Sequence, residues 1–170
     1  MKIPKPFLGF LFLSAIFFVS LPVFASPKIL AQPFPQMPQQ EITPGSLCER
    51  PDELRYQERI NYCNRSVGGA LKARVFDTYE NLGYELLRRF PRAEFKIDHF
   101  IPLCAGGSNE EDNLWPQHRQ IFSITDELEQ VTCEKLAQGR IRHAEALDFI
   151  RRGKLNLQLV QTILSSVKAR

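Results

Sequence analysis

The stretch FKIDHFIPLCAGGSNEEDNLWPQ, residues 95–117, decides how this chain of 170 residues is organised. Its first half is a strand-like run from Phe95 that contains the pair Asp98-His99, and a proline and a Gly-Gly turn follow. Its second half is a short acidic link and an Asn-Leu-Trp sequence with the only tryptophan of the chain. Successive side chains of a regular strand point to opposite faces, so Asp98 and His99 can act on one group only where the strand bends or ends.

The amino-terminal residues have the pattern of a secretory signal peptide. Two lysines precede a short apolar run, and a Val-Phe-Ala sequence ending at Ala25 fits the small-residue rule for cleavage. A membrane anchor is the alternative, but the run is short for a spanning helix. We therefore expect residues 1–25 to be removed and the mature protein to be periplasmic or secreted, without stable membrane association. Removal leaves 20 of the 22 basic residues against 19 acidic ones, a net charge of +1 that indicates no particular partner.

Residues 26–46 are rich in proline and glutamine and lack hydrophobic periodicity, so they are predicted to form a flexible or extended tether. The remaining residues, 47–170, suffice for one domain and not two. The spacing of apolar residues, glycines and capping residues predicts several helices in this domain. They are a short helix over 51–63, a helix from Ser66 that Gly83 ends, a helix from Ser123 or Thr125 that Gly139 ends, a helix over 143–152 that Gly153 ends, and a last helix over 157–167.

Four cysteines, all of them after the signal sequence, indicate how the domain is stabilised. An even number of cysteines in an exported chain predicts two disulfides, for which three pairings are possible. We favour Cys48–Cys63 and Cys104–Cys133, because each pair joins neighbouring elements. A tetrahedral zinc site is the rival interpretation, but such sites usually contain closely spaced cysteine pairs, and the sequence has none.

The densest group of basic residues comes directly before the Asp98-His99 pair. A run of charges is most often only a solvated surface. Its place beside a candidate site favours contacts with phosphate groups, because lysine and arginine are the residues that neutralise the nucleic-acid backbone. We therefore predict that this group binds nucleic acid; it consists of Arg88, Arg89, Arg92 and Lys96.

The pattern D-H-x-x-P-L-x-x-G-G-x-N-x-x-x-N-L resembles the HNH endonuclease family and its beta-beta-alpha-metal hairpin. It is similar in particular to small exported bacterial HNH-like proteins, in which an apolar helix with a late Cys and a Gly follow the Asn-Leu-Trp-Pro-Gln sequence. The resemblance covers residues 63–152, with a core motif over 95–138. It implies an α+β fold in which an HNH-like hairpin packs with several α-helices and is stapled by disulfides. The residues that carry it are Asp98, His99, Pro102, Leu103, Gly106, Gly107, Asn109, Asn113 and Leu114.

The resemblance implies an exported, metal-dependent nuclease that hydrolyses phosphodiester bonds in DNA or RNA, and we expect a monomer. His99 is then the general base, because a neutral imidazole can take a proton from water near neutral pH. Asp98 offers a hard oxygen ligand to one divalent cation, magnesium first, with manganese or zinc as alternatives. Asn113 bridges the hairpin and helps orient His99 through backbone hydrogen bonds; the alternative is that its carbonyl oxygen binds the metal.

One position departs from the family pattern. Many HNH enzymes carry a second metal ligand on the helix after the hairpin, and Phe122 stands at that position here. His118 is the nearest replacement ligand, and the alternative for it is an exposed histidine at a helix start. The missing ligand motivates a second hypothesis, a catalytically inactive HNH-like binding or structural module of the cell envelope. A third hypothesis is a purely structural turn in which Asp98 accepts hydrogen bonds from backbone amides.

Overall fold

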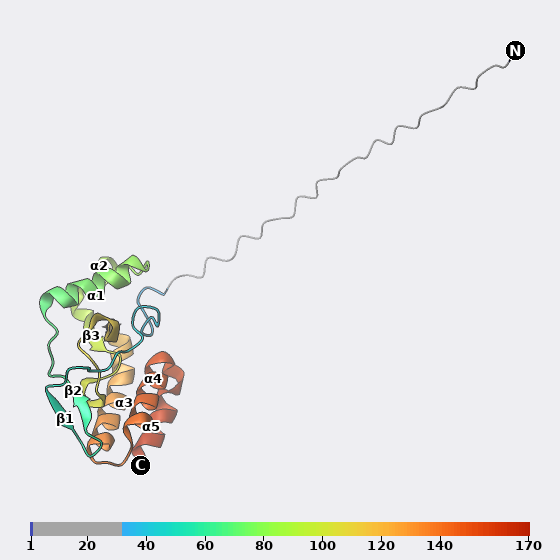
Figure 1. Ribbon diagram of the computed structural model, residues 1–170. Helices are drawn as coiled ribbons and strands as arrows, with labels where there is room; N and C mark the ends of the chain where they lie inside the picture. Colours follow the sequence, from blue (N-terminus) through green and yellow to red (C-terminus); the bar gives the residue numbers. More distant parts are fainter. Residues whose placement is uncertain (2–31) are drawn as a thin grey trace.

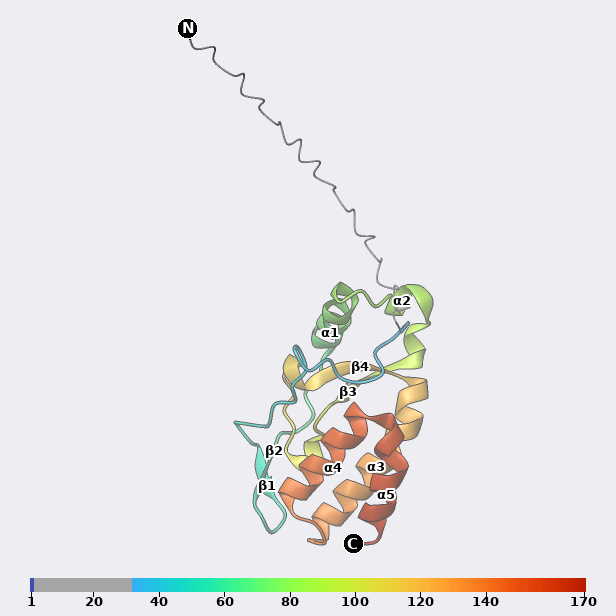
Figure 2. The same ribbon diagram turned by 90° about the vertical axis from the view of Figure 1, so that its right-hand side faces the viewer.

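An antiparallel hairpin of strand β3 (Phe95–His99) and strand β4 (Leu114–His118) lies between two groups of helices (Figure 1). The computed structural model describes Met1 and residues 32–170, so the rest of the predicted signal peptide and residues 26–31 of the predicted tether lie outside the described residues. Figure 2 shows α1 (Gly69–Asn81) and α2 (Leu86–Arg89) on one side of the hairpin, and α3 (Arg119–Ala137), α4 (His143–Leu155) and α5 (Val160–Lys168) on the other.

Both faces of this central hairpin are buried. All five residues of β4 and four of the five residues of β3 are buried, as expected for strands that helices cover on two sides. Towards α1, Phe95 and Ile97 share a hydrophobic cluster with Phe76, and Trp115 belongs to the same cluster. The predicted α+β class is confirmed for the described residues, which contain two small antiparallel hairpins and five α-helices.

Helices α3, α4 and α5 pack around a second cluster that includes Leu128, Ile150 and Val160. Gly153 lies inside α4, where an added Cβ would be 2.2 Å from Leu128 Cδ2. The glycine therefore allows α3 and α4 to approach closely. The prediction that Gly153 ends the helix is wrong, because α4 continues to Leu155.

Helix α1 begins and ends beside glycines. Its N-cap is Gly68, without a side-chain hydrogen bond, so the predicted cap Ser66 does not cap it. Gly83 follows the helix with a φ of 96°, in the left-handed region that favours glycine, and the predicted end is confirmed. The buried residues of α1 are Val75, Phe76 and Tyr79, which lie on one face of the helix at i, i+1 and i+4.

Residues 51–63 form a hairpin and not the predicted helix. Strand β1 (Glu53–Arg55) pairs antiparallel with strand β2 (Ile60–Tyr62), and Tyr56 and Arg59 take positive φ angles in the turn between them. Acidic residues after a proline are typical of a first helical turn, which is why the sequence suggested one. Ile60 is the only buried residue of this segment, so a helix would have no apolar face to pack.

Helix α3 begins at Arg119 and not at the predicted caps Ser123 or Thr125. Its N-cap is His118, whose ring accepts a hydrogen bond from a backbone N–H of the first turn at 3.3 Å. The end of the helix is confirmed, because Gly139 follows it with a φ of 66°. The last predicted helix is a 3-10 turn, Leu157–Leu159, followed by α5. The other 3-10 turns of the described residues are Arg92–Glu94, Leu103–Ala105 and Glu111–Asn113.

The second half of the predicted tether packs against the domain. Phe34 and Thr43 are buried, with 5% and 1% exposure. The hydroxyl of Tyr79 lies 2.8 Å from the Thr43 hydroxyl and accepts a hydrogen bond from the backbone N–H of Gln39 at 3.1 Å. Residues 32–46 contain no helix and no strand, yet they have fixed partners in the core and are part of the domain.

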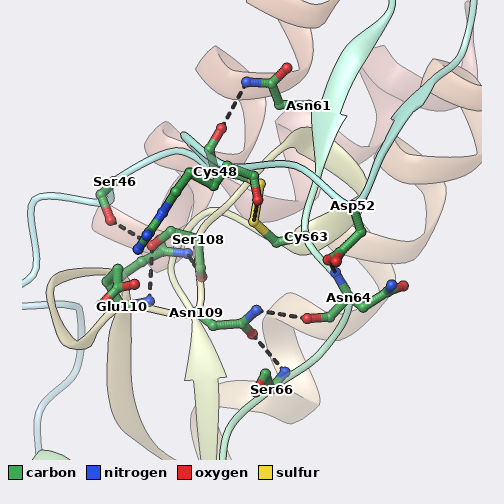
Figure 3. The surroundings of a disulfide bond; sticks show 12 residues. Ser46, Cys48, Asp52, Asn61, Cys63, Asn64, Ser66, Ser108, Asn109 and Glu110 are labelled. Carbon is green, nitrogen blue, oxygen red and sulfur yellow. Dashed lines mark hydrogen bonds between the residues drawn. A yellow bond between two sulfur atoms is a disulfide. The ribbon is translucent and has the colours of Figure 1, made fainter.

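Both predicted disulfides are confirmed. Cys48–Cys63 and Cys104–Cys133 each join Cα atoms 5.8 Å apart, and Figure 3 shows the surroundings of the first. The second joins the loop between β3 and β4 to α3. Two disulfides indicate an oxidising, non-cytoplasmic compartment. No helix within the described residues is long and apolar enough to span a membrane.

Candidate active site at the end of the central hairpin

Asp98 and His99 are the last two residues of β3, and both are buried. In the hairpin register, Asp98 lies opposite Trp115 and His99 lies opposite Leu114. The indole N–H of Trp115 donates a hydrogen bond to Asp98 Oδ2 at 3.3 Å. Asp98 and His99 have different partners: the carboxylate of Asp98 contacts α4, whereas the ring of His99 contacts the loop that follows β3.

The carboxylate of Asp98 is paired with a buried lysine. Lys154 of α4 is 1% exposed. Its ammonium donates hydrogen bonds to Asp98 Oδ2 at 2.7 Å, to Glu129 Oε2 at 2.7 Å and to the backbone carbonyl of His99 at 2.6 Å. Lys96 contacts the other carboxylate oxygen, Asp98 Oδ1, at 3.3 Å. Both oxygens of Asp98 are therefore engaged by groups of the protein itself.

Burial and charge act in opposite directions on this network. Burial alone would lower the pKa of Lys154, but the carboxylates of Asp98 and Glu129 outweigh it and raise the pKa. Burial would raise the pKa of Asp98, yet Lys154 and Lys96 together hold it below its ordinary value. Burial raises the pKa of Glu129, and the attraction of Lys154 does not offset it. Asp98 and Lys154 are consequently a charged pair at neutral pH.

His99 is held in one orientation by Asn109. Its Nε2 lies 3.1 Å from Asn109 Oδ1. The amide of Asn109 is itself oriented, because its Nδ2 donates to the carbonyl of Asn64 at 2.8 Å and its Oδ1 accepts from the backbone N–H of Ser66 at 3.1 Å (Figure 3). Asn109 thus offers an oxygen to the ring, so Nε2 carries the proton and the lone pair of neutral His99 is on Nδ1.

The pKa of His99 lies below its ordinary value. Burial is the largest cause, since the ring is 4% exposed, and the nearby charge of Arg65 lowers the pKa further. The hydrogen bond to Asn109 and the charge of Asp98 act in the other direction without reversing the shift. The imidazole is therefore neutral at neutral pH, which is the protonation state that a general base requires.

Asn113 is fully buried and fastens the loop between β3 and β4. Its amide nitrogen donates to the carbonyls of Ile101 and Ser108, both at 2.9 Å, and its oxygen accepts from the backbone N–H of Ile101 at 2.8 Å. The carbonyl of Asn113 accepts from the N–H of Phe100 at 2.7 Å. Gly107 closes the loop, where an added Cβ would be 1.8 Å from a backbone oxygen. These bonds are those of a residue that bridges the hairpin.

His118 lies at the opposite end of the hairpin, across from Phe95 in the register. Its ring is 2% exposed and stacks on Phe34 with centroids 3.9 Å apart. The rings of Phe90 and Phe95 lie 5.1 Å from it, and its Nε2 is 2.9 Å from Glu94 Oε2. The structure does not bring His118 together with the Asp-His pair.

The residues predicted to bind a divalent cation do not fit a single site. The oxygens of Asp98 accept hydrogen bonds from lysines and an indole, while both ring nitrogens of His118 are used at the other end of the hairpin. Among residues 32–170, no group of three His, Cys, Asp or Glu side chains is arranged to hold a metal ion. Phe122, at the position of the second ligand in the family, faces the ammonium of Lys96 at 5.0 Å from its ring centre.

The four basic residues predicted to bind nucleic acid all have partners within the protein. Arg88 and Arg89 pair with Glu85 of the same segment, although both remain exposed. Arg92 donates to a backbone carbonyl at 2.7 Å, and Lys96 pairs with an aspartate of α3 at 2.6 Å. Arg92 lies at the His118 end of the hairpin, because Phe95 is paired with His118, whereas Lys96 also contacts Asp98 at 3.3 Å.

A cleft of about 620 Å³ lies beside Asn109. Arg50 is among the residues that line it. Ser66, Glu110 and the Cys48–Cys63 disulfide, which Figure 3 shows, line it as well. Arg65 is exposed and precedes Ser66 in the chain. The cleft therefore combines one exposed arginine, Arg50, with the amide that holds His99, and acidic side chains also line it.

Sequence reasoning missed two residues that define the site. Lys154 is one of them, because nothing in its own segment of the sequence indicates that its ammonium reaches β3. Asn109 was recognised as a motif residue without a role, and its position ten residues after His99 was the available signal. Comparisons with protein-family models, curated proteins and solved structures find no match to this chain.

Proposed function

We propose that this protein is an HNH-type nuclease that hydrolyses phosphodiester bonds in DNA or RNA, with His99 as its general base. Support comes first from the order of the elements: hairpin β3–β4 and helix α3 follow one another over the core motif, as the beta-beta-alpha arrangement requires. The observation that carries the proposal is the setting of His99. The imidazole is neutral and lies at the end of β3, and it is fixed by Asn109, a residue that lines a cleft.

The chemistry assigned to His99 is proton transfer at one atom. With Nε2 donating to Asn109, the lone pair of Nδ1 accepts a proton from the water that attacks the phosphorus. One ester P–O bond of the phosphodiester breaks as the new P–O bond forms, and the departing oxygen takes a proton from solvent water. Asn109 keeps this tautomer, and Asn113 keeps the loop that carries Asn109 in place. Phosphate contacts are assigned to Arg50, which lines the cleft, and to the exposed Arg65, which precedes the lining residue Ser66.

Export is part of the proposal, because the disulfides indicate an oxidising compartment and the signal sequence predicts a route to it. A nuclease outside the cytoplasm meets foreign or released nucleic acid and not the genome of the cell. DNA and RNA remain equal candidates as substrates, since none of the contacts described above distinguishes a ribose 2′-hydroxyl.

The test is an assay of the purified mature protein on plasmid DNA and on single-stranded RNA, with magnesium, with manganese, and with a chelator. We expect His99→Ala to lower the rate by about 10²- to 10⁴-fold, the usual contribution of a general base. Arg152→Ala, an exposed change purified in the same way, serves as the control and should keep the wild-type rate. Equal rates for wild type and a folded His99→Ala would refute the assignment.

A second candidate is a catalytically inactive HNH-like module that binds or supports envelope components. It is favoured by one observation, the use of both Asp98 oxygens by Lys154, Lys96 and Trp115. This candidate predicts no hydrolysis of either substrate under any of the three ionic conditions, with the arginine and histidine variants equal to wild type.

A further inference from the structure

The ammonium of Lys154, on α4, occupies a cage of three oxygen atoms that come from two other elements. Asp98 and the carbonyl of His99 come from β3, Glu129 comes from α3, and Lys154 itself comes from α4. An ammonium has three donors, and the three oxygens lie at 2.6–2.7 Å, so every donor is used. The cage holds one positive charge between two carboxylates.

This set of oxygens is of the kind that holds a hard divalent cation. Calcium and magnesium bind carboxylates and backbone carbonyls, and such ions need no nitrogen or sulfur ligand. In this chain the position beside Asp98 where the family resemblance implies such an ion is taken by a cation that is covalently part of the protein. Phe122 and the distant His118 agree with that replacement, because neither supplies a ligand near Asp98.

The lysine cannot easily leave the cage. Lys154 follows Gly153 in the part of α4 that packs closely on Leu128, and its side chain is 1% exposed. An incoming ion would take from the ammonium all three of its oxygen partners, and a buried charge that loses its partners is strongly unfavourable. The aliphatic part of the side chain would also lose its place in the core.

We propose that the ammonium of Lys154 replaces the divalent cation at Asp98, so that the protein binds no such ion there, and that removing the ammonium opens an oxygen site for one. The inference goes beyond nucleic-acid hydrolysis and does not depend on it, because it concerns occupancy of the site and is read by ion binding. It assigns Lys154 as a positioning residue that keeps Asp98, Glu129 and the end of β3 together.

The test uses the only tryptophan of the chain as a local reporter. Terbium has the ligand preference of calcium, and it luminesces when a nearby indole transfers energy to it. Trp115 Nε1 is 3.3 Å from Asp98 Oδ2, so a terbium ion bound at that oxygen would be excited through the indole. Terbium is titrated into the full mature protein, into Lys154→Met, and into Arg152→Met as the matched control on the same helix. We expect Lys154→Met to bind at least about tenfold more tightly than the other two, and calcium to displace the terbium.

Three results of these measurements would count against the proposal. Wild-type protein that binds terbium as tightly as Lys154→Met would overturn the proposal, as would a gain that persists when Glu129→Gln is added to Lys154→Met. Should Lys154→Met be unfolded without ions, calcium is expected to restore its circular dichroism spectrum, and failure to restore it also counts against the proposal. Loss of nuclease activity plays no part in these readouts.

Discussion

The two ends of the β3–β4 hairpin each bury one histidine, and they do so with opposite chemistry. His99 and His118 are 4% and 2% exposed. At the first end, an amide fixes the ring of His99 and a network of charges lies behind its backbone. At the second end, the ring of His118 is stacked on Phe34 and surrounded by phenylalanines, and its nitrogens serve a helix cap and one carboxylate.

The difference shows that burial of a histidine does not by itself indicate a role. The phenylalanine rings around His118 contact it by dispersion forces, which are non-directional. The surroundings of His99 are directional, because hydrogen bonds with defined partners fix the Asp98 carboxylate, the Asn109 amide and the Lys154 ammonium. Stability at the His99 end therefore depends on a few charged groups, whereas at the His118 end it depends on many small contacts.

The largest expected effect follows from removing the charge at the His99 end. Lys154→Met leaves Asp98 and Glu129 in the protein interior without their main cation. Removing one partner of a buried ion pair costs about 3–5 kcal/mol, so we expect the free energy of unfolding to fall by that amount. Chemical denaturation in the absence of divalent ions measures it.

Arg152→Met is the matched control, because Arg152 lies on the same helix and its ion pair with Asp148 is solvent-exposed. Exposed pairs contribute about 0–1 kcal/mol, so this variant should stay within that range of wild type. Equal effects of the two substitutions would mean that the charges at the His99 end are no more important than those on the surface.

A smaller but still large effect is expected at the His118 end. Phe34→Ala removes the ring that stacks on His118 and leaves a cavity beside Phe90. The free energy of unfolding should fall by about 3 kcal/mol, at the lower end for a buried phenylalanine because the segment before β1 can adjust. The control Met37→Ala, 43% exposed in the same segment, should change it by less than about 0.5 kcal/mol. If Phe34→Ala behaves like its control, residues 32–46 are a tether after all.

The comparison also shows which features can be predicted from sequence. The strand that ends on Asp98-His99 and the two disulfides follow from local patterns, since β-branched and aromatic runs and the order of cysteines are local information. Helix ends at Gly83 and Gly139 are local in the same way, because a left-handed residue after the helix favours glycine. These predictions needed no knowledge of what packs against what.

The errors come from contacts between distant segments. Gly153 has the appearance of a helix stop until Leu128 is seen against it, 25 positions earlier in the chain. Lys154 reaches Asp98 across 56 positions, and nothing near Lys154 reveals that its ammonium is buried. His118 follows Asn113 closely in sequence, yet the antiparallel register carries it away from Asp98 to the far end of the hairpin. Pairing of side chains across elements is decided by packing and not by spacing along the chain.

The smallest expected effect concerns the protonation of His99. Its folded pKa lies below the ordinary value of about 6.5, so between that value and the folded pKa the unfolded chain binds a proton that the folded chain does not. The free energy of unfolding contributed by His99 is then fully present above about pH 6.5 and is lost as the pH falls, with a slope of at most about 1.4 kcal/mol per pH unit.

Two neighbouring carboxyl groups do not obscure this effect. Asp98 does not contribute between pH 7 and 5, because its pKa is lowered and its contribution to the free energy of unfolding is lost only below about pH 4. Glu129, whose raised pKa acts with the opposite sign, is present in both proteins when wild type is compared with His99→Gln. The free energies of unfolding of wild type and His99→Gln, measured in urea from pH 7 to 5, should therefore differ by less as the pH falls. A constant difference would mean that His99 takes up a proton in the folded protein as readily as in the unfolded chain.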